Sequence, residues 1–198
     1  GKFNSSGAAQ WYYVPDQTGS GYFPFPEGNL AVTAHGHCFV ETRKRVRILG
    51  DTLADGNGTK QGLFLLDPSG QPVWARKLNT TGQLAINDIH TDGEGNVLLA
   101  GQSYGPTINM VDTVINSSNN GYNVFLGRYA GSTGAITGLL NGPALQDVMG
   151  VGVDANGIPV ICGTAPGSAP LSSTTITGSW NGFVAGRGST TDIEEIDA

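Results

Sequence analysis

The chain has few of the features that point to an enzyme, a nucleic-acid-binding protein or a membrane protein. Only 13% of its 198 residues are charged, against about 25% in an average soluble domain. Its net charge is −6, and without a broad basic surface this argues against nucleic acid as a partner. No signal peptide and no long apolar run is visible, so we expect no direct insertion into a membrane.

Catalytic motifs are missing as well. The sequence contains no Gly-x-Ser-x-Gly elbow, no Walker loop, no dinucleotide fingerprint and no His-Glu-x-x-His. The one dense group of carboxylates runs from Asp192 to Asp197, in a tail that we expect to be flexible. A glycosidase must hold its carboxylates rigidly at about 5–10 Å from each other. We therefore expect no enzymatic activity in this chain.

Glycine, by contrast, is abundant, at 31 of 198 residues. A segment ending in a turn glycine occurs three times, and these glycines (Gly7, Gly70 and Gly134) are 63 and 64 residues apart. Trp11 and Trp74 each follow their glycine by four residues. A fixed period of this size indicates a repeat protein.

Further residues keep the same register. Apolar runs follow turns at Asp92 and Asp154, and phenylalanine recurs at Phe64, Phe125 and Phe183. Each repeat thus has about four short β-rich runs between clusters of Gly, Asn, Asp and Ser, which is typical of antiparallel hairpins. The sequence predicts an all-β protein of β-propeller type, with four-stranded antiparallel blades.

The register also places the repeats. We expect a part-blade over 1–13, blades over about 20–77, 85–140 and 145–188, and an acidic tail over 189–198. Propellers usually have at least about four blades, so about three repeats predict a fragment of a longer array, or blades completed by another copy of the chain. Both repeated tryptophans should be largely buried at equivalent positions, each covering a Phe-bearing strand.

A family resemblance rests on these same residues. The run Ile48–Lys77, followed by Asp92–Gly101, resembles the bacterial β-propeller repeats called SBBP, found in large secreted proteins; Gly138 departs from it where a Trp is expected. The C-terminal Ser189–Ala198 is similar to the acidic linker before the sorting domain of proteins exported by the bacterial type IX system. The resemblance implies a secreted or surface-displayed protein. A plain solvated tail is the other interpretation of this segment.

Two modification sites follow from the resemblance. Asp51-Thr52-Leu53 and Asp112-Thr113-Val114 fit the Asp-Ser/Thr-aliphatic pattern that bacteria with type IX secretion O-glycosylate, which marks Thr52 and Thr113. The alternative is that Asp-Thr closes a turn while the aliphatic residue packs.

The histidines and cysteines offer little chemistry. His35 and His37 have the spacing that places two side chains on one face of a strand, where they could bind zinc or copper, but surface or turn histidines are the simpler interpretation. Cys38 and Cys162 lie in the first and third repeats, too far apart for a disulfide. We expect both to be free, with Cys162 at a small buried site like that of Ala100.

Two segments resemble fragments of calcium loops. Asp55 with Asn57, and Asp92 with Glu94, alternate oxygen donors with glycine, but neither segment continues to the bidentate Glu of such a loop. Tight hairpin turns require the same residue types. We expect turns and no cofactor, with weak calcium binding as the alternative.

A basic run forms the last candidate site. Alternation along a strand would place Arg43, Arg45 and Arg47 on one face, where they could meet an anionic partner such as an acidic glycan. The alternative is a protruding hairpin whose charges prevent edge-to-edge pairing.

The sequence favours a non-catalytic secreted or cell-surface module for structural support, adhesion or partner binding. Its partners would be further blades, other copies of itself, another surface protein or polysaccharide. One alternative is an accessory domain of a secreted hydrolase whose catalytic part lies upstream. Another is a subunit of a surface filament that assembles by exchange of strands or blades. In each case we expect partners to cover the terminal strands around Lys2–Tyr13 and Gly182–Arg187.

Overall fold

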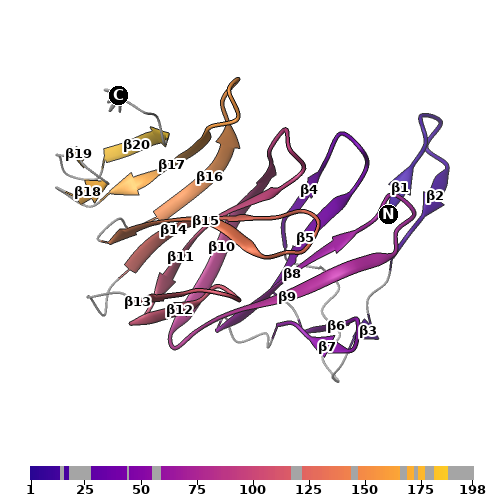
Figure 1. Ribbon diagram of the computed structural model, residues 1–198, viewed down its shortest axis with the longest axis horizontal. Helices are drawn as coiled ribbons and strands as arrows, with labels where there is room; N and C mark the ends of the chain where they lie inside the picture. Colours follow the sequence, from indigo (N-terminus) through magenta and orange to yellow (C-terminus); the bar gives the residue numbers. More distant parts are fainter. Residues whose placement is uncertain are drawn as a thin grey trace.

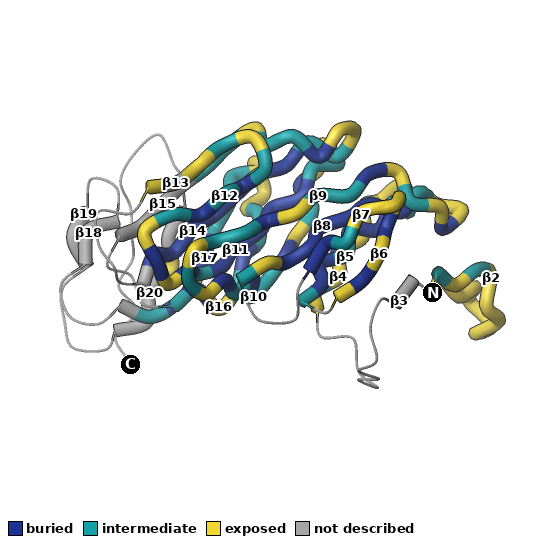
Figure 2. Tube along the Cα trace, turned by 90° about the horizontal axis from the view of Figure 1, so that it is seen from below, coloured by how far each residue is buried: buried dark blue, intermediate teal, exposed yellow. Residues whose placement is uncertain are grey.

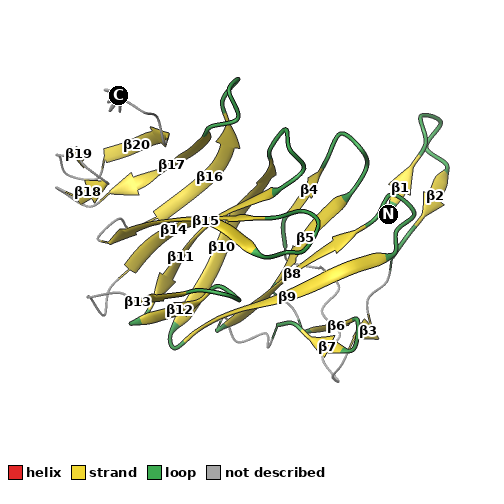
Figure 3. Cartoon of the chain, in the orientation of Figure 1, coloured by secondary structure: helices red, strands yellow, loops and turns green. Residues whose placement is uncertain are grey.

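The computed structural model describes most of the chain as β-structure (Figure 1). The described residues are 1–13, 16–17, 28–43, 45–54, 59–116, 122–143, 147–165, 169–171, 174–176 and 181–186. Among them every regular element is a strand, as Figure 3 shows, and every pairing is antiparallel. The predicted all-β class is confirmed. Asp55, Asn57 and the tail 189–198 lie outside the described residues.

Three successive parts of the chain each fold into an antiparallel meander, and the three sheets lie side by side in Figure 1. The first sheet is formed by β4 (Leu30–Val32), β5 (Cys38–Thr42), β8 (Lys60–Leu66) and β9 (Pro72–Thr80), and a hairpin of the next repeat extends it to six strands beyond β9. The second sheet consists of β10 (Gln83–Thr91), β11 (Val97–Tyr104), β14 (Tyr122–Tyr129) and β15 (Ile136–Pro143). The third sheet consists of β16 (Asp147–Val153), β17 (Pro159–Ala165) and β20 (Asn181–Gly186).

The N-terminal hairpin repeats the end of a sheet. It consists of β1 (Lys2–Phe3) and β2 (Ala9–Trp11). By register it corresponds to the hairpin of β8 and β9, with its turn glycine and its Trp in the same places, and to that of β14 and β15, which shares the turn glycine but has Gly138 in place of the Trp. In Figure 1 it lies at the far end of the molecule from the third sheet.

Each repeat also contains a short extra hairpin between its second and third strands. These inserted hairpins are β6 (Val46–Ile48) with β7 (Asp51–Thr52), β12 (Thr107–Asn109) with β13 (Val114–Asn116), and β18 (Ala169–Leu171) with β19 (Thr174–Ile176). β12 pairs with β9 of the first sheet, β6 pairs with β3 (Asp16–Gln17), and β18 lies against β15. Every inserted hairpin therefore contacts the chain of the preceding repeat.

The largest hydrophobic core lies between the first and second sheets. The first sheet contributes mainly Phe39, Leu63, Leu65, Trp74 and Leu78, and the second mainly Leu84, Ile86, Val97, Leu99, Phe125 and Tyr129. Because neighbouring side chains of a strand point to opposite faces, Leu98 and Ala100 face away from this core, toward the side on which β16 lies. Both faces are buried, as the dark centre of the sheets in Figure 2 shows. Burial on both faces explains the continuous apolar run of β11.

The outer faces of the stack are less well covered. A second core on the far face of the first sheet is closed by the hairpin of β6 and β7, with Trp11 and Tyr13 packed against it. Leu30 and Val32 on β4 nevertheless stay exposed. Met149 and Val184 on the third sheet are exposed as well. The two ends of the stack thus present apolar side chains to solvent, as expected for sheet faces without a partner.

Candidate functional site

Tight turns of one design connect the strands. In four of them a side-chain Oδ1 accepts the backbone N–H groups two and four residues later, at 2.8–3.1 Å; the acceptors are Asn4, Asp67, Asp92 and Asp154. The glycine three residues after each acceptor has φ between 76° and 87°, a region that favours glycine. Hydrogen bonds within the turns lower the pKa of Asp67 and of Asp154. The turns predicted from the sequence are confirmed for the described copies.

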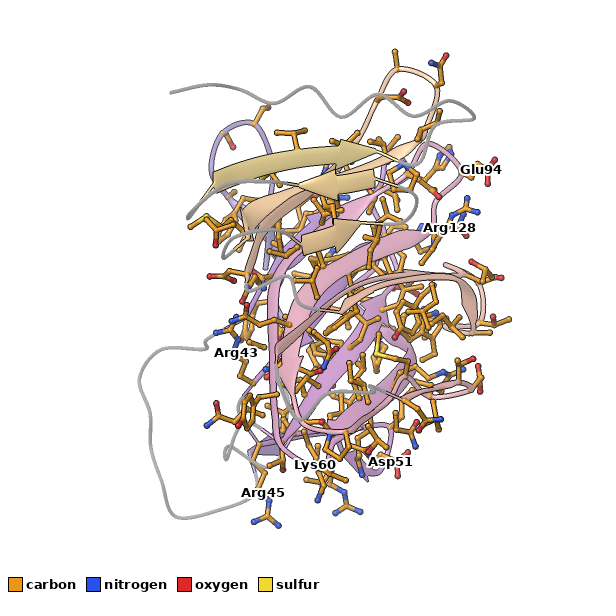
Figure 4. The ribbon with its side chains drawn as sticks, turned by 90° about the vertical axis from the view of Figure 1, so that its left-hand side faces the viewer. Arg43, Arg45, Asp51, Lys60, Glu94 and Arg128 are labelled. Atoms are coloured by element: carbon orange, nitrogen blue, oxygen red, sulfur yellow. The ribbon has the colours of Figure 1, made fainter. Side chains whose placement is uncertain are left out.

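The Asp92 and Glu94 pair is part of such a turn. Oδ2 of Asp92 accepts from Asn96 Nδ2 at 2.9 Å and from Arg128 Nε and Nη2 at 2.9 and 2.6 Å. Glu94 Oε2 accepts from the same guanidinium at 2.6 Å, and Figure 4 shows the two side chains together. Burial raises the pKa of Asp92, but the hydrogen bonds outweigh it and the pKa lies below its ordinary value. An arginine thus occupies the place that a cation would take.

The histidines do not share a strand. His35 and His37 lie in the turn between β4 and β5, which the bond from Thr33 N–H to the carbonyl of His37 closes at 2.9 Å. His35 is exposed and His37 is half-buried. The favoured interpretation of surface or turn histidines is confirmed, and the strand placement that a metal site would need is not observed, because Gly36, with φ at 82°, reverses the chain between them. In the part of the chain that the structure describes, no group of three His, Cys, Asp or Glu side chains could hold a metal ion.

The three arginines do not form one face. β5 ends at Thr42 and β6 begins at Val46, so no single strand carries them and the expected alternation is wrong. Arg43 is half-buried and its Nη2 donates to the carbonyl of Ile86 in the second sheet. Arg45 and Arg47 are exposed, and Figure 4 shows Arg45 well away from Arg43.

Near the first strands of the sheets, polar side chains of one sheet form hydrogen bonds to the backbone of the next. We call these side chains the polar layer. Asn29 Nδ2 donates to the carbonyl of Ile86 at 3.2 Å, and Asn87 Nδ2 donates to that of Val148 at 2.5 Å. These carbonyls lie next to the register shifts in β10 and β16, where the regular ladder is interrupted. A β-bulge leaves backbone groups unpaired, and the amides satisfy them. The same contact thus joins the first sheet to the second and the second to the third.

Gln61 and Asp88 complete this polar layer. Gln61 in β8 donates through Nε2 to the carbonyl of Leu84 at 2.6 Å and accepts from the N–H of Ile86 at 2.9 Å. Asp88 Oδ2 accepts from the N–H of Val151 in the third sheet at 2.9 Å. Sequence reasoning missed these residues, because no local pattern announces that a side chain will bond to the backbone of another repeat.

Glu41 is the buried acid of the layer. It lies on the same face of β5 as Phe39, and its Oε2 accepts from the backbone N–H and from Nδ2 of Asn29, both at 3.1 Å. Its Oε1 lies 3.9 Å from Arg43 Nε, and neither atom has a hydrogen-bond partner in the structure. Burial raises the pKa of Glu41 to about 7, although Arg43 and Asn29 oppose the rise.

This environment makes stability depend on pH. Between the ordinary pKa of 4.5 and the folded value of about 7, the folded state binds more protons than the unfolded state. The free energy of unfolding should therefore fall as the pH rises through this window, by about 3 kcal/mol at about 1.4 kcal/mol per pKa unit. Urea denaturation from pH 4 to pH 8 measures the decline. Glu41→Gln should remove most of it, and equal slopes for the two proteins would contradict the expectation.

Trp11 and Trp74 are bound in the same way. Nε1 of Trp74 donates to the carbonyl of Gly131 at 2.8 Å, and Nε1 of Trp11 donates to that of Pro68 at 2.9 Å, in each case 57 residues later. A Cβ added to Gly134 would lie 2.8 Å from the Trp74 ring, and one added to Gly70 would lie 2.6 Å from the Trp11 ring. Each indole thus rests on the turn of the following repeat.

The two tryptophans are buried to different degrees. Trp74 is 5% exposed, and its ring centroid lies 5.9 Å from that of Phe39. Trp11 occupies the equivalent position, is partly buried and packs against the core on the far face of the first sheet. It is the less buried of the two because its hairpin of β1 and β2 is largely exposed, whereas β9 is paired with β8 on one side and with β12 on the other.

The two cysteines are free, as predicted. Cys38 is buried, and burial raises its pKa. Cys162 is exposed, so its expected similarity to the fully buried Ala100 is wrong. Ala100 faces the side that β16 covers, whereas Cys162 points away from the buried face on which Ile161 lies.

Thr52 and Thr113 lie in equivalent inserted hairpins. Both are half-buried, and the preceding Asp51 and Asp112 are exposed. The carbonyl of Thr113 accepts from the N–H of Met110 at 2.8 Å, which closes the turn before β13. Tight turns and exposed aspartates fit both turn closure and modification.

Comparison with models of known protein families found no match, and comparison with curated proteins found none either. Within the described residues there is no helix that is long and apolar enough to cross a membrane.

Proposed function

We propose that the three sheets are blades of a β-propeller and that the chain is a non-catalytic support and binding module of a secreted or cell-surface protein. The observation that carries this proposal is the repetition of one interface. The Asn contact, the tryptophan on the next turn and the inserted hairpin each join one repeat to its neighbour. A stack with a constant interface is the architecture that propellers and other repeat proteins share.

The order of the strands supports blades around a common axis. The first strands of the three sheets, β4, β10 and β16, are neighbours, so they would be the innermost strands of successive blades. The turns between strands would then lie on the rims of the propeller, where loops contact partners.

The use of the buried polar groups supports a non-catalytic role. Gln61, Asn87, Asp88 and Asp92 bond to backbone or side chains of the fold itself. An active site needs polar groups that converge on a place for a substrate. The secreted location is supported by the resemblance to SBBP repeats and to type IX sorting linkers, and so is an accessory role beside a catalytic domain.

A surface filament is the second candidate. It is supported by the exposed apolar residues at both ends of the stack, Leu30 and Val32 at one and Met149 and Val184 at the other. The mass of the purified protein as a function of concentration, measured by light scattering, separates the two candidates. For a filament subunit the measured mass should increase with protein concentration. For a module that is completed by other blades it should stay constant.

Surface display is tested on intact cells of the native host. An antibody against residues 1–198 should label unpermeabilised cells, and proteinase K added to intact cells should remove the signal while a cytoplasmic control protein survives. Protection from the protease until the cells are lysed would overturn the proposed location.

Binding of the purified protein to the polysaccharide of the same cells, compared with binding to an unrelated neutral glucan, tests the recognition role.

Glycosylation is expected at Thr52 and Thr113. Protein from the native host should yield peptides that carry a glycan mass on each of these threonines, because both lie in inserted hairpins, directly after an exposed aspartate. Asp51→Ala and Asp112→Ala should abolish the modification at the neighbouring threonine, with Thr91 as an internal unmodified control. Peptides of unmodified mass at both positions would contradict the expectation.

A further inference from the structure

Trp11 and Trp74 each insert into a turn of the following repeat. We call the indole the plug and the turn that receives it the socket. In the socket of Trp11, the turn glycine Gly70 leaves room for the ring and the carbonyl of Pro68 accepts from the indole. In that of Trp74, Gly134 and the carbonyl of Gly131 do the same.

The hydrophobic residue just before each turn belongs to the same contact. Leu66 precedes the first turn and lies in the core against which Trp11 packs. Tyr129 precedes the second turn and lies in one core with Trp74. Both are buried, with 4% and 0% of their surface exposed.

The N-terminal hairpin contains the same turn without a plug. Asn4 Oδ1 accepts from the N–H groups of Ser6 and Ala8, and the Gly7 N–H donates to the Asn4 carbonyl at 3.0 Å, as in the turn at Asp67. Gly7 has φ at 80°, against 87° for Gly70. A Cβ added to Gly7 would meet nothing within 4 Å. We call the turn over residues 4–8 the open socket.

A second observation marks the open socket as incomplete. Phe3 holds the place that Leu66 holds in the next copy, directly before the turn, and it is 63% exposed. An aromatic ring at a position that is buried elsewhere in the array indicates a surface that packs against something. The first sheet also has exposed apolar side chains, at Leu30 and Val32.

We propose that the open socket receives a tryptophan from the fourth strand of a further repeat of the same construction. The indole would lie over Gly7 and Phe3, and its N–H would donate to the carbonyl of Ser5, which corresponds to Pro68. This proposal rests on the propeller organisation given above, but not on the secreted location.

A second copy of this chain is not the source of the plug. Of its three tryptophans, Trp11 and Trp74 already occupy sockets of their own, and Trp180 directly precedes β20, a third strand and not a fourth one. The third hairpin, of β14 and β15, carries Gly138 four residues after its turn glycine, where a plug would stand. The occupant is therefore a repeat outside these 198 residues.

An extended protein tests the proposal. Residues 1–64 are placed ahead of Lys2 of the full chain, so that the added copy runs into the original in the natural 63-residue register. The Trp11 of the added copy then stands where a plug for the open socket is required. Hydrogen–deuterium exchange of the original residues 2–8 should slow by about tenfold or more, the size of one net hydrogen bond with its packing. The matched control carries Trp11→Gly in the added copy only and should lose this protection.

A second variant blocks the open socket with a side chain. Gly7→Asn in the original part keeps the left-handed backbone, which asparagine tolerates, but places a side chain where the indole would lie. It should lower the stability of the 198-residue protein only slightly, by the cost of asparagine at a positive φ, and abolish the protection in the extended protein. Gly70→Asn, which meets a filled socket, should destabilise both. Equal protection with and without the added tryptophan would overturn the socket while sparing the propeller organisation. If the added copy stays unfolded, so that a protease removes it, both the socket and the propeller organisation would be overturned.

Discussion

Replacing Trp74 by alanine should lower the free energy of unfolding by about 3–5 kcal/mol, the usual cost of removing a buried aromatic side chain. The indole is almost fully buried in the core between the first and second sheets, and its N–H has a partner in the second sheet. The loss therefore includes apolar contacts, a hydrogen bond and the contact with the turn at Gly134. Urea denaturation followed by the remaining fluorescence and by circular dichroism measures it.

Two neighbouring substitutions calibrate this result. Trp11→Ala removes the same contact at a half-buried position and should cost clearly less than Trp74→Ala. Val73→Ala, next to Trp74 but 46% exposed, should change stability by less than about 0.5 kcal/mol. A cost for Trp74→Ala no larger than that for Val73→Ala would mean that the interface between the sheets does not depend on the indole.

Gly101→Val should cost about 3 kcal/mol or more, and the second sheet should lose its native packing. Gly101 lies in β11, where a Cβ would come within 2.3 Å of the Ala85 carbonyl oxygen and 2.8 Å of the Phe125 ring. The carbonyl belongs to the backbone of the neighbouring strand and cannot rotate away. Near-ultraviolet circular dichroism and the urea midpoint measure the effect.

The matched control is Gly152→Val in β16. Nothing lies within 4 Å of a Cβ at Gly152, and its backbone is not in the left-handed region. Valine also favours strands over glycine, so this variant should be neutral or slightly stabilised. A similar loss of stability for both variants would show that the space around Gly101 is not what limits the side chain.

The repeat and its turns could be predicted because they depend on residues that are close together in the sequence. Asp67 and Gly70 are three residues apart, and the bonds from the aspartate to the turn follow from that spacing alone. The same holds for the alternation of strands and turns, and for the period itself, which is set by residues such as Trp11 and Trp74.

The contacts between repeats could not be predicted in the same way. Asn29 reaches the carbonyl of Ile86 only because β10 bulges there, and bulges leave no reliable local signal. Alternation along the arginine run fails for a related reason. Arg45 and Arg47 flank the buried Val46 as alternation requires, but β5 ends at Thr42, and the half-buried Arg43 bonds to the second sheet instead.

The inserted hairpins bear on how such an array changes its length. Each hairpin reaches back to the preceding repeat, and β12 is held to β9 by main-chain hydrogen bonds in an antiparallel ladder. A ladder of this kind tolerates many side chains, so a repeat can accept a hairpin from any successor of the same construction. Recombination that removes or duplicates whole repeats would then leave every junction intact. Such genes would be free to vary in copy number, and the length of the array could adapt without redesign of any surface within it.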